Sequence, residues 1–143
     1  MKQEELNGIL KRHKAWMDGK DGGERADLHG EVLCDADLRH TDLRHADLRD
    51  TELHGAKLYH ADMRDADIDF ASWPLWCGPL KAYVDDRIAI QLLYHTLSVV
   101  QYSPYVSEDV KKALLSAENV RIANRFHRIG ECREIKEWEE GTK

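Results

Sequence analysis

Apolar residues recur at every fifth position through ten consecutive pentads that begin at Ala26. The first position of each pentad is a small Ala or Thr, except for Glu31 in the second pentad. A period of five matches neither the α-helical period of 3.6 nor the strand period of two. It predicts a solenoid, in which each repeat buries its apolar residue against neighbouring repeats. The apolar residues, each third in its pentad, are Leu28, Leu33, Leu38, Leu43, Leu48, Leu53, Leu58, Met63, Ile68 and Trp73.

The individual repeats have a recognisable sequence. ADLRH, TDLRH, ADLRD and ADMRD resemble the A-(D/N)-L-x-x motif of the pentapeptide-repeat family, and the resemblance extends from Ala26 to about Leu75. It implies a right-handed, four-sided β-helix with four pentads per coil, in which the first and third residues of each pentad point inward. Ten pentads then make roughly two and a half coils, or about 12 Å of solenoid at the usual strand spacing. The expected fold class is a mainly β solenoid with α-helical caps.

Four pentads per coil would place residues twenty apart above one another. Trp73 is bulky for an internal position and is expected to mark the last rung, after which Pro74 and Gly78 break the period. Glu31 departs from the small-residue pattern. Either its pentad is bulged, or its carboxylate turns outward to a base such as Arg12 or Lys14.

The flanking segments have helical periodicity and are expected to cap the open ends of the β-helix. A capping helix is predicted within residues 1–20, a β-helix over 24–75, and a C-terminal helical cap or interaction segment over 84–138. The last segment is expected to hold three helices: from residues 85–86 past 100, from 107 to 115, and from about 118 to 138. No separate second core is expected. The predicted apolar face of the N-terminal helix consists of Leu6, Ile9, Leu10, His13, Trp16 and Met17. That of the helix beginning at residues 85–86 consists of Ile88, Ala89, Leu92, Leu93, Thr96 and Val100. That of the last helix consists of Ile122, Phe126 and Ile129, with Arg133 on the same side.

Charge and cysteine content limit the classes of protein. The chain has a formal net charge of −6, and residues 26–70 carry twelve acidic and only five basic side chains. Cys34, Cys77 and Cys132 form no C-x-x-C pair, and their odd number disfavours a disulfide framework. The sequence has no signal peptide and no apolar run of about 18 residues. A cytoplasmic protein without a membrane span is therefore expected.

The sequence contains no motif for a phosphate-binding loop, a dinucleotide site, a zinc protease or a serine hydrolase. We therefore expect neither an enzyme nor a cofactor. His40 and His60 would stack one coil apart and could share a metal ion, or could alter the surface charge with pH. No set of four ligands has a recognisable spacing, so no metal site is predicted.

Aspartates at the second pentad position would form outward columns. The resemblance implies a protein-binding function, by analogy with fluoroquinolone-resistance proteins of the family, which resemble B-form DNA and bind DNA gyrase. A solenoid of this height matches only about three or four base pairs, and arginines at the fourth position interrupt its negative charge. The candidate partner-binding residues are Asp27, Asp47 and Asp67 in one column, Asp42 and Asp62 in another, and Asp37.

Two hypotheses follow for the function. The first is a non-catalytic inhibitor of a host nucleic-acid-binding enzyme, which binds that protein and not the nucleic acid itself. The stretches WPLWCG and DDRIAIQLLYH look like those of phage or prophage accessory proteins, which points to an anti-defence role. The alternative is a structural or homodimeric scaffold that associates through its C-terminal helices, with the acidic faces serving only solubility.

Overall fold

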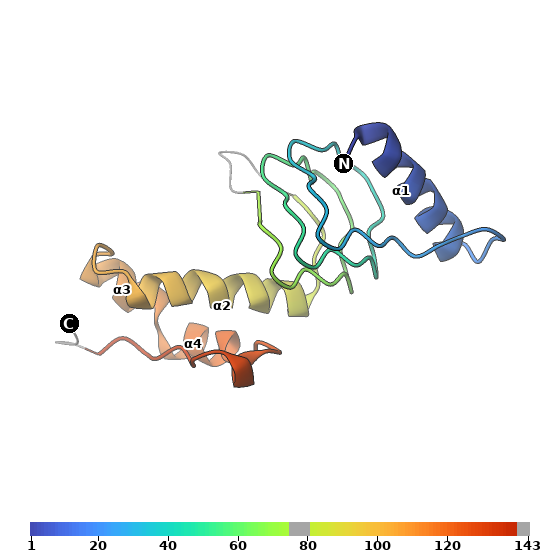
Figure 1. The fold of residues 1–143 in the computed structure, drawn as a ribbon. Coiled ribbons are helices and arrows are strands. Elements are labelled where there is room, and N and C mark those ends of the chain that lie inside the picture. Colours follow the sequence, from blue (N-terminus) through green and yellow to red (C-terminus); the bar gives the residue numbers. More distant parts are fainter. Residues whose placement is uncertain (75–80, 140–143) are drawn as a thin grey trace. The chain divides into compact units, whose positions relative to one another are not determined.

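The computed structural model describes residues 1–74 and 81–139. The chain forms two compact units, Met1–Asp85 (the repeat unit) and Asp86–Lys143 (the helical unit). The repeat unit contains α1 (Gln3–Met17) and the pentads (Figure 1). The helical unit contains α2 (Asp86–Tyr102), α3 (Glu108–Leu114), α4 (Ala117–Ala123) and the 3-10 helix η1 (Ile129–Glu131).

The repeat unit is a solenoid with a coil of twenty residues. Parallel bridges join Asp27 to Asp47 and Asp47 to Asp67, and equivalent bridges join the other pentads. Leu28 N–H donates to the Asp47 carbonyl at 2.8 Å, and Asp47 N–H donates to the Ala26 carbonyl at 2.9 Å. The expected stacking of residues twenty apart is confirmed. The other bridges with this offset are Val32–Glu52, Asp37–Lys57, Asp42–Asp62 and Glu52–Ser72.

Each of the first nine pentads contributes one bridged residue followed by a turn, so the described residues form no longer strand. The turn comes from the fifth position, where the backbone is left-handed in every pentad from the first to the ninth. Glycine adopts this conformation freely, and Asp and His tolerate it better than most residues. The β-helix that pentapeptide repeats imply is therefore built here from isolated bridges. The fifth-position residues are Gly30, Asp35, His40, His45, Asp50, Gly55, His60, Asp65 and Phe70.

The inward register is confirmed. Nine of the ten third-position residues, from Leu28 to Ile68, are at most 4% exposed. Most of the small first-position residues are buried beside them, including Thr51, whose hydroxyl donates to the Leu28 carbonyl at 2.9 Å. Close packing of large and small side chains in alternation fills the interior of the coils.

The solenoid continues beyond Trp73, so the expectation that this residue marks the last rung is wrong. Tyr83 bridges to Asp62, and its N–H donates to the Ala61 carbonyl at 2.8 Å. His60 N–H also donates to the Lys81 carbonyl at 3.0 Å. The expected break at Gly78 lies outside the described residues.

Glu31 does not disturb the coil. The bridge between Val32 and Glu52 forms normally, and Glu52 N–H donates to the Glu31 carbonyl at 2.9 Å. The expected bulge is therefore absent. Arg12 pairs instead with Glu24, at 3.1 Å between Nε and Oε2. Within residues 1–74 and 81–139, no ion pair joins Glu31 to Arg12 or Lys14.

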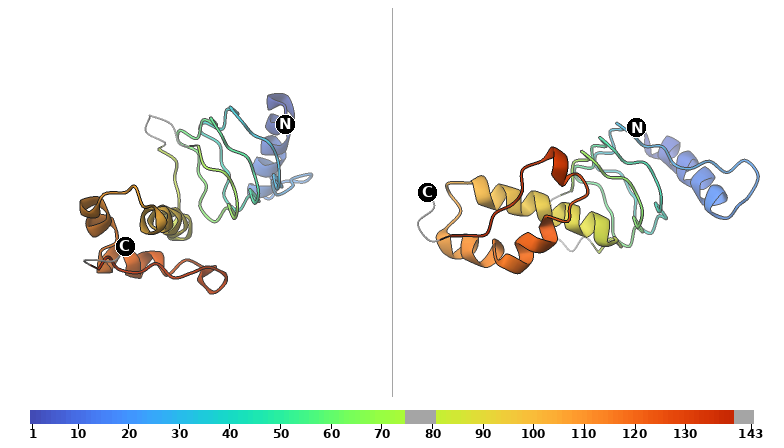
Figure 2. Two further views of the ribbon diagram at one scale, coloured as in Figure 1. Left: turned by 60° about the vertical axis from the view of Figure 1, so that its left-hand side comes forward. Right: turned by 90° about the horizontal axis from the view of Figure 1, so that it is seen from below.

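Helix α1 lies against the first coil (Figures 1 and 2). The Gln3 side-chain amide donates to the Asp37 carbonyl at 3.1 Å and accepts the Asp37 N–H at 2.9 Å. Leu6 and His13 are buried, as expected of the apolar face. Trp16 departs from that expectation, since it is 38% exposed.

The helical unit has its own hydrophobic core, so the expectation of no second core is wrong. Helix α2 contacts both α3 and α4 (Figure 2). Its buried residues include Tyr94 and Leu97, whereas the predicted Ala89 and Thr96 are exposed. The apolar residues of α2 cover more than one face of the helix, so either of two faces could be buried. The face that is buried carries Tyr94, whose ring stacks on Phe126. The core residues are Tyr94, Leu97, Val100, Leu115, Val120, Ala123, Phe126 and Ile135.

The predicted helix over residues 118–138 is also wrong, because α4 ends at Ala123. The Asn124 side chain accepts the Ile135 N–H and donates to the Ile135 carbonyl, each at 2.9 Å. Trp138 N–H then donates to the Leu115 carbonyl at 3.0 Å. These bonds hold the last segment as a returning extended chain, in which Ile135 becomes part of the core.

Candidate binding surface

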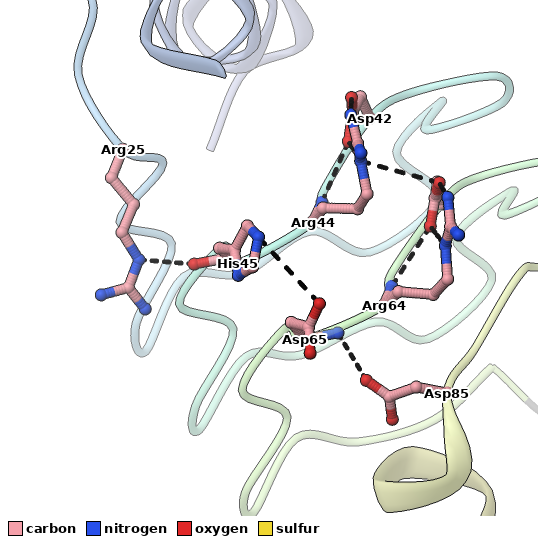
Figure 3. Close-up of polar contacts among 8 residues, drawn as sticks. Arg25, Asp42, Arg44, His45, Arg64, Asp65 and Asp85 are labelled. Atoms are coloured by element: carbon pink, nitrogen blue, oxygen red, sulfur yellow. Dashed lines mark hydrogen bonds and ion pairs between the residues drawn. The ribbon is translucent and has the colours of Figure 1, made fainter.

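Each Asp-x-Arg sequence in the repeats forms a local clamp. In the fourth pentad, Arg44 Nε and Nη2 donate to the two carboxylate oxygens of Asp42 at 2.9 and 2.7 Å (Figure 3). The Arg44 backbone N–H donates to the same carboxylate at 3.2 Å. A two-residue offset brings both side chains to the outer surface and makes this fork-to-fork geometry available. The same clamps join Arg39 to Asp37, Arg49 to Asp47 and Arg64 to Asp62.

The clamps keep both partners charged. Hydrogen bonds from the arginines lower the pKa of Asp37, Asp42, Asp47 and Asp62 below the ordinary aspartate value. In return, the carboxylates raise the pKa of each arginine. A bidentate pair presents little net charge to a distant partner. Four of the six candidate partner-binding aspartates are therefore locally neutralised.

Asp27 and Asp67 belong to pentads that have no arginine. Asp27 accepts the His29 N–H at 3.1 Å, and Asp67 accepts the Asp69 N–H at 3.2 Å. His29 and Asp69 occupy the fourth position, where the clamped pentads have arginine. Arg49 Nε from the neighbouring coil lies 3.9 Å from Asp67 Oδ2.

The twenty-residue register sorts the pentads into four columns, numbered in chain order from the pentad at Ala26. The first column (pentads 26–30, 46–50 and 66–70) has five acids and one base, and the second (31–35 and 51–55) has three acids and no base. Their formal charges are −4 and −3. The third column (36–40 and 56–60) has a charge of +1 and the fourth (41–45 and 61–65) a charge of −1. The acidity of the repeats thus lies on two adjacent columns.

Histidine and tyrosine rings form a ladder on the third column. The ring centroids of His40 and His60 are 5.2 Å apart in a stacked arrangement, which confirms their expected placement. Tyr83 extends the ladder, with its hydroxyl 2.7 Å from His60 Nδ1. Tyr59 meets His60 edge-on at 4.1 Å, and the Lys81 ammonium lies 5.4 Å from the Tyr59 centroid.

The fourth column combines a histidine with two carboxylates. His45 Nε2 lies 4.0 Å from Asp65 Oδ2, as the predicted stacking requires (Figure 3). Asp65 N–H donates to the Asp85 carboxylate at 2.5 Å, and Arg25 Nε donates to the His45 carbonyl. These contacts tie the column to both flanking segments of the repeat unit.

Sequence reasoning missed one group of side chains. Cys34, Glu52 and His54 meet on the second column, within 4.8 Å of one another at their ligand atoms. The spacing that reveals them is the coil length, since Cys34 and His54 are both fourth in their pentads and twenty residues apart. The coil length had been applied to His40 and His60 but not to the pentads of Cys34 and His54.

The family model for pentapeptide repeats matches residues 32–68, in eight copies. This segment, about a quarter of the chain, is therefore a run of pentapeptide repeats, as its sequence indicates. Proteins with such repeats are in general non-catalytic modules that bind other proteins, and the repeats imply a right-handed β-helix. No curated protein matches the chain. Among the described residues, no helix has the length and apolar character needed to cross a membrane.

Proposed function

We propose that this protein is a non-catalytic binding module that engages a basic, nucleic-acid-binding site on a protein partner. The observation that supports this proposal is the sorting of charge by the coil register. The first and second columns together carry a formal charge of −7, whereas the other two columns sum to zero. The module would therefore present one acidic side and one side of balanced charge.

The first column is the main contact in this proposal. Asp27, Asp47 and Asp67 succeed one another through direct bridges, which fixes their spacing at about 4.8 Å. Asp50, which is 53% exposed, adds a further carboxylate beside them. A rigid row of carboxylates attracts a basic site before contact and increases the rate of association. Asp37, Asp42, Asp47 and Asp62 contribute less in this proposal, because arginine clamps neutralise them. The attraction of the row therefore comes mainly from Asp27 and Asp67, with Asp50 beside them.

Occupation of such a site would exclude nucleic acid from the partner, so the module would act as an inhibitor. The acidic columns would repel phosphates, so the protein itself would bind no nucleic acid. In a phage or prophage setting, the same activity would oppose a host defence enzyme or redirect a host nucleic-acid enzyme.

Affinity capture from a bacterial lysate tests the proposal. The immobilised full-length protein is compared with two double variants, Asp27→Asn/Asp67→Asn and Asp42→Asn/Asp62→Asn, at low and high salt. Each variant removes two negative charges, but only the first removes carboxylates that lack an arginine in their own pentad. We expect a captured protein that double-stranded DNA displaces and that salt weakens. Its capture should fall several-fold with the first variant and little with the second.

Equal capture by all three proteins, with no effect of DNA or salt, would contradict the proposal. Equal loss with both variants would contradict the assignment to the first column.

A scaffold or homodimer built through the C-terminal helices is the second candidate. It is supported by exposed apolar side chains on the helical unit: Val99 is 68% exposed, Tyr102 56% and Tyr105 95%. Sedimentation velocity over a range of concentrations tests it. A dimer that Val99→Ser/Tyr105→Ser abolishes would support this candidate, and a monomer at every concentration would contradict it.

A further inference from the structure

Three potential metal ligands of different chemistry lie together on the second column. The Cys34 Sγ, a Glu52 carboxylate oxygen and a His54 ring nitrogen are within 4.8 Å of one another. Cys34 Sγ and Glu52 Oε2 are 3.9 Å apart. All three side chains are exposed, so an ion in solution can reach them.

The coil register holds the backbones of these residues in place. Leu33 N–H donates to the Glu52 carbonyl and Asp35 N–H donates to the His54 carbonyl, both at 2.8 Å. Cys34 lies between the two bonds, directly beside the segment 52–54. Glu52 and His54 are exposed while Leu53 between them is buried, so both point outward on the side of Cys34.

A neighbouring hydroxyl can orient the imidazole. Ser72 Oγ accepts the Leu53 N–H at 2.9 Å and lies 3.4 Å from His54 Nδ1. With a metal ion on Nε2, the Nδ1–H would donate to Ser72 Oγ. Histidine ligands commonly have such a second hydrogen bond, which fixes the ring and its tautomer.

We propose that Cys34, Glu52 and His54 bind a Zn²⁺ ion. Thiolate, imidazole and carboxylate together suit zinc, whereas Mg²⁺ and Ca²⁺ prefer oxygen ligands alone. Ligand atoms around tetrahedral zinc are about 3.5 Å apart, given metal–ligand bonds of about 2.0–2.3 Å. Rotation of exposed side chains closes the present separations to that value.

Binding replaces the Cys34 S–H bond with an S–Zn bond and releases the proton to solvent. The absence of any basic residue from the second column favours the cation electrostatically. Three protein ligands leave a fourth coordination position, which water or a side chain of a binding partner would fill. The site is thus distinct from the aspartate row of the first column.

Titration with Co²⁺, a spectroscopic substitute for Zn²⁺, tests the site in the reduced full-length protein without an affinity tag. A thiolate-to-Co²⁺ charge-transfer band should saturate at one equivalent, and one equivalent of Zn²⁺ should remove it. Cys34→Ser should abolish the band. His54→Gln and Glu52→Gln should each weaken Co²⁺ affinity at least about tenfold, since each removes one of three ligands.

The matched control is Cys77→Ser/Cys132→Ser, which leaves Cys34 as the sole thiol and should retain the full band. Thermal melts without metal should be alike for wild type and the three ligand variants, because the three ligands are exposed. A wild-type protein without the band, or a band that persists in Cys34→Ser, would overturn the proposal.

Discussion

The backbone N–H of Ala26 donates a 3.0 Å hydrogen bond to Nδ1 of His13, and this bond joins α1 to the first pentad. Both residues are buried. The His13 ring stacks on Trp16, with centroids 5.6 Å apart. Burial lowers the pKa of His13 below its ordinary value of 6.5. The imidazole is therefore held neutral, with Nδ1 as a hydrogen-bond acceptor.

The free energy of unfolding should consequently depend on pH through His13. Between its folded and unfolded pKa values the unfolded chain binds more protons, so stability rises with pH in that window. Stability from this residue is complete above about pH 6.5 and is lost as the pH falls below it, with a slope of at most about 1.4 kcal/mol per pH unit.

Urea denaturation of wild type and His13→Asn between pH 5 and pH 8 measures this effect. Asparagine keeps an acceptor near the position of Nδ1 but does not titrate. The difference in stability between the two proteins should favour the wild type more strongly as the pH rises. A difference that is constant over this range would contradict a neutral buried His13.

The second prediction concerns the stability cost of a charged residue at an inward and at an outward position of the repeats. Leu48 is fully buried, so Leu48→Asp would place a carboxylate among apolar side chains at a cost of several kcal/mol. Val32→Asp introduces the same residue at an outward position that is 46% exposed, and should change stability by less than about 1 kcal/mol. Thermal melts that show equal losses would contradict the register.

The left-handed fifth position makes a third prediction. Gly30 has a φ of 68°, and no atom lies within 4 Å of the Cβ that a substitution would add. Only backbone strain then distinguishes one replacement from another. Gly30→Asn should be nearly neutral, whereas β-branched Gly30→Val should cost about 1–2 kcal/mol. Chemical denaturation that ranks the two variants equally would refute the left-handed turn.

The pairing of Tyr83 with Ala61 makes a fourth prediction. A fragment that ends at residue 85 keeps this rung. One that ends at residue 80 lacks it and removes the partners of the His60 N–H, the Ala61 carbonyl and the Met63 N–H. Unpaired solenoid edges promote association. The longer fragment should therefore melt at a higher temperature and aggregate less, as measured by circular dichroism and light scattering. Identical behaviour of the two fragments would mean that the rung contributes nothing.

The solenoid could be predicted from the sequence because its signal is repeated ten times. A period of five fixed the inward residues, and four pentads per coil fixed neighbours such as His40 and His60. The sequence indicated only that the arginines interrupt the negative charge, and the Asp–Arg clamps were not predicted, although Asp-x-Arg recurs at one spacing. The pairing of Tyr83 with Asp62 could not be predicted, because it follows a stretch whose sequence lacks the pentad pattern and it departs from the twenty-residue offset.

The helical unit was harder to predict because its elements have no repetition. Its long helix has apolar residues around most of its circumference, so the sequence alone could not select the face with Tyr94 and Leu97. The last segment has helical spacing at Phe126 and Ile129, yet tertiary bonds from Asn124 hold the following chain extended. Tertiary contacts of this kind override local periodicity.

The twenty-residue coil places different constraints on the interior and on the surface of the solenoid. Insertion of a single pentad between residues 45 and 46 would keep an apolar side chain at every inward position and leave packing nearly unchanged. It would also turn all later repeats by a quarter of a coil relative to the earlier ones. Asp27 would then face the second residue of the inserted pentad in place of Asp47, and Cys34 would face Arg49 in place of His54. Only the insertion or deletion of whole coils preserves the outer pattern. The surface therefore allows the number of pentads to change only in steps of four, whereas the core places almost no constraint on that number.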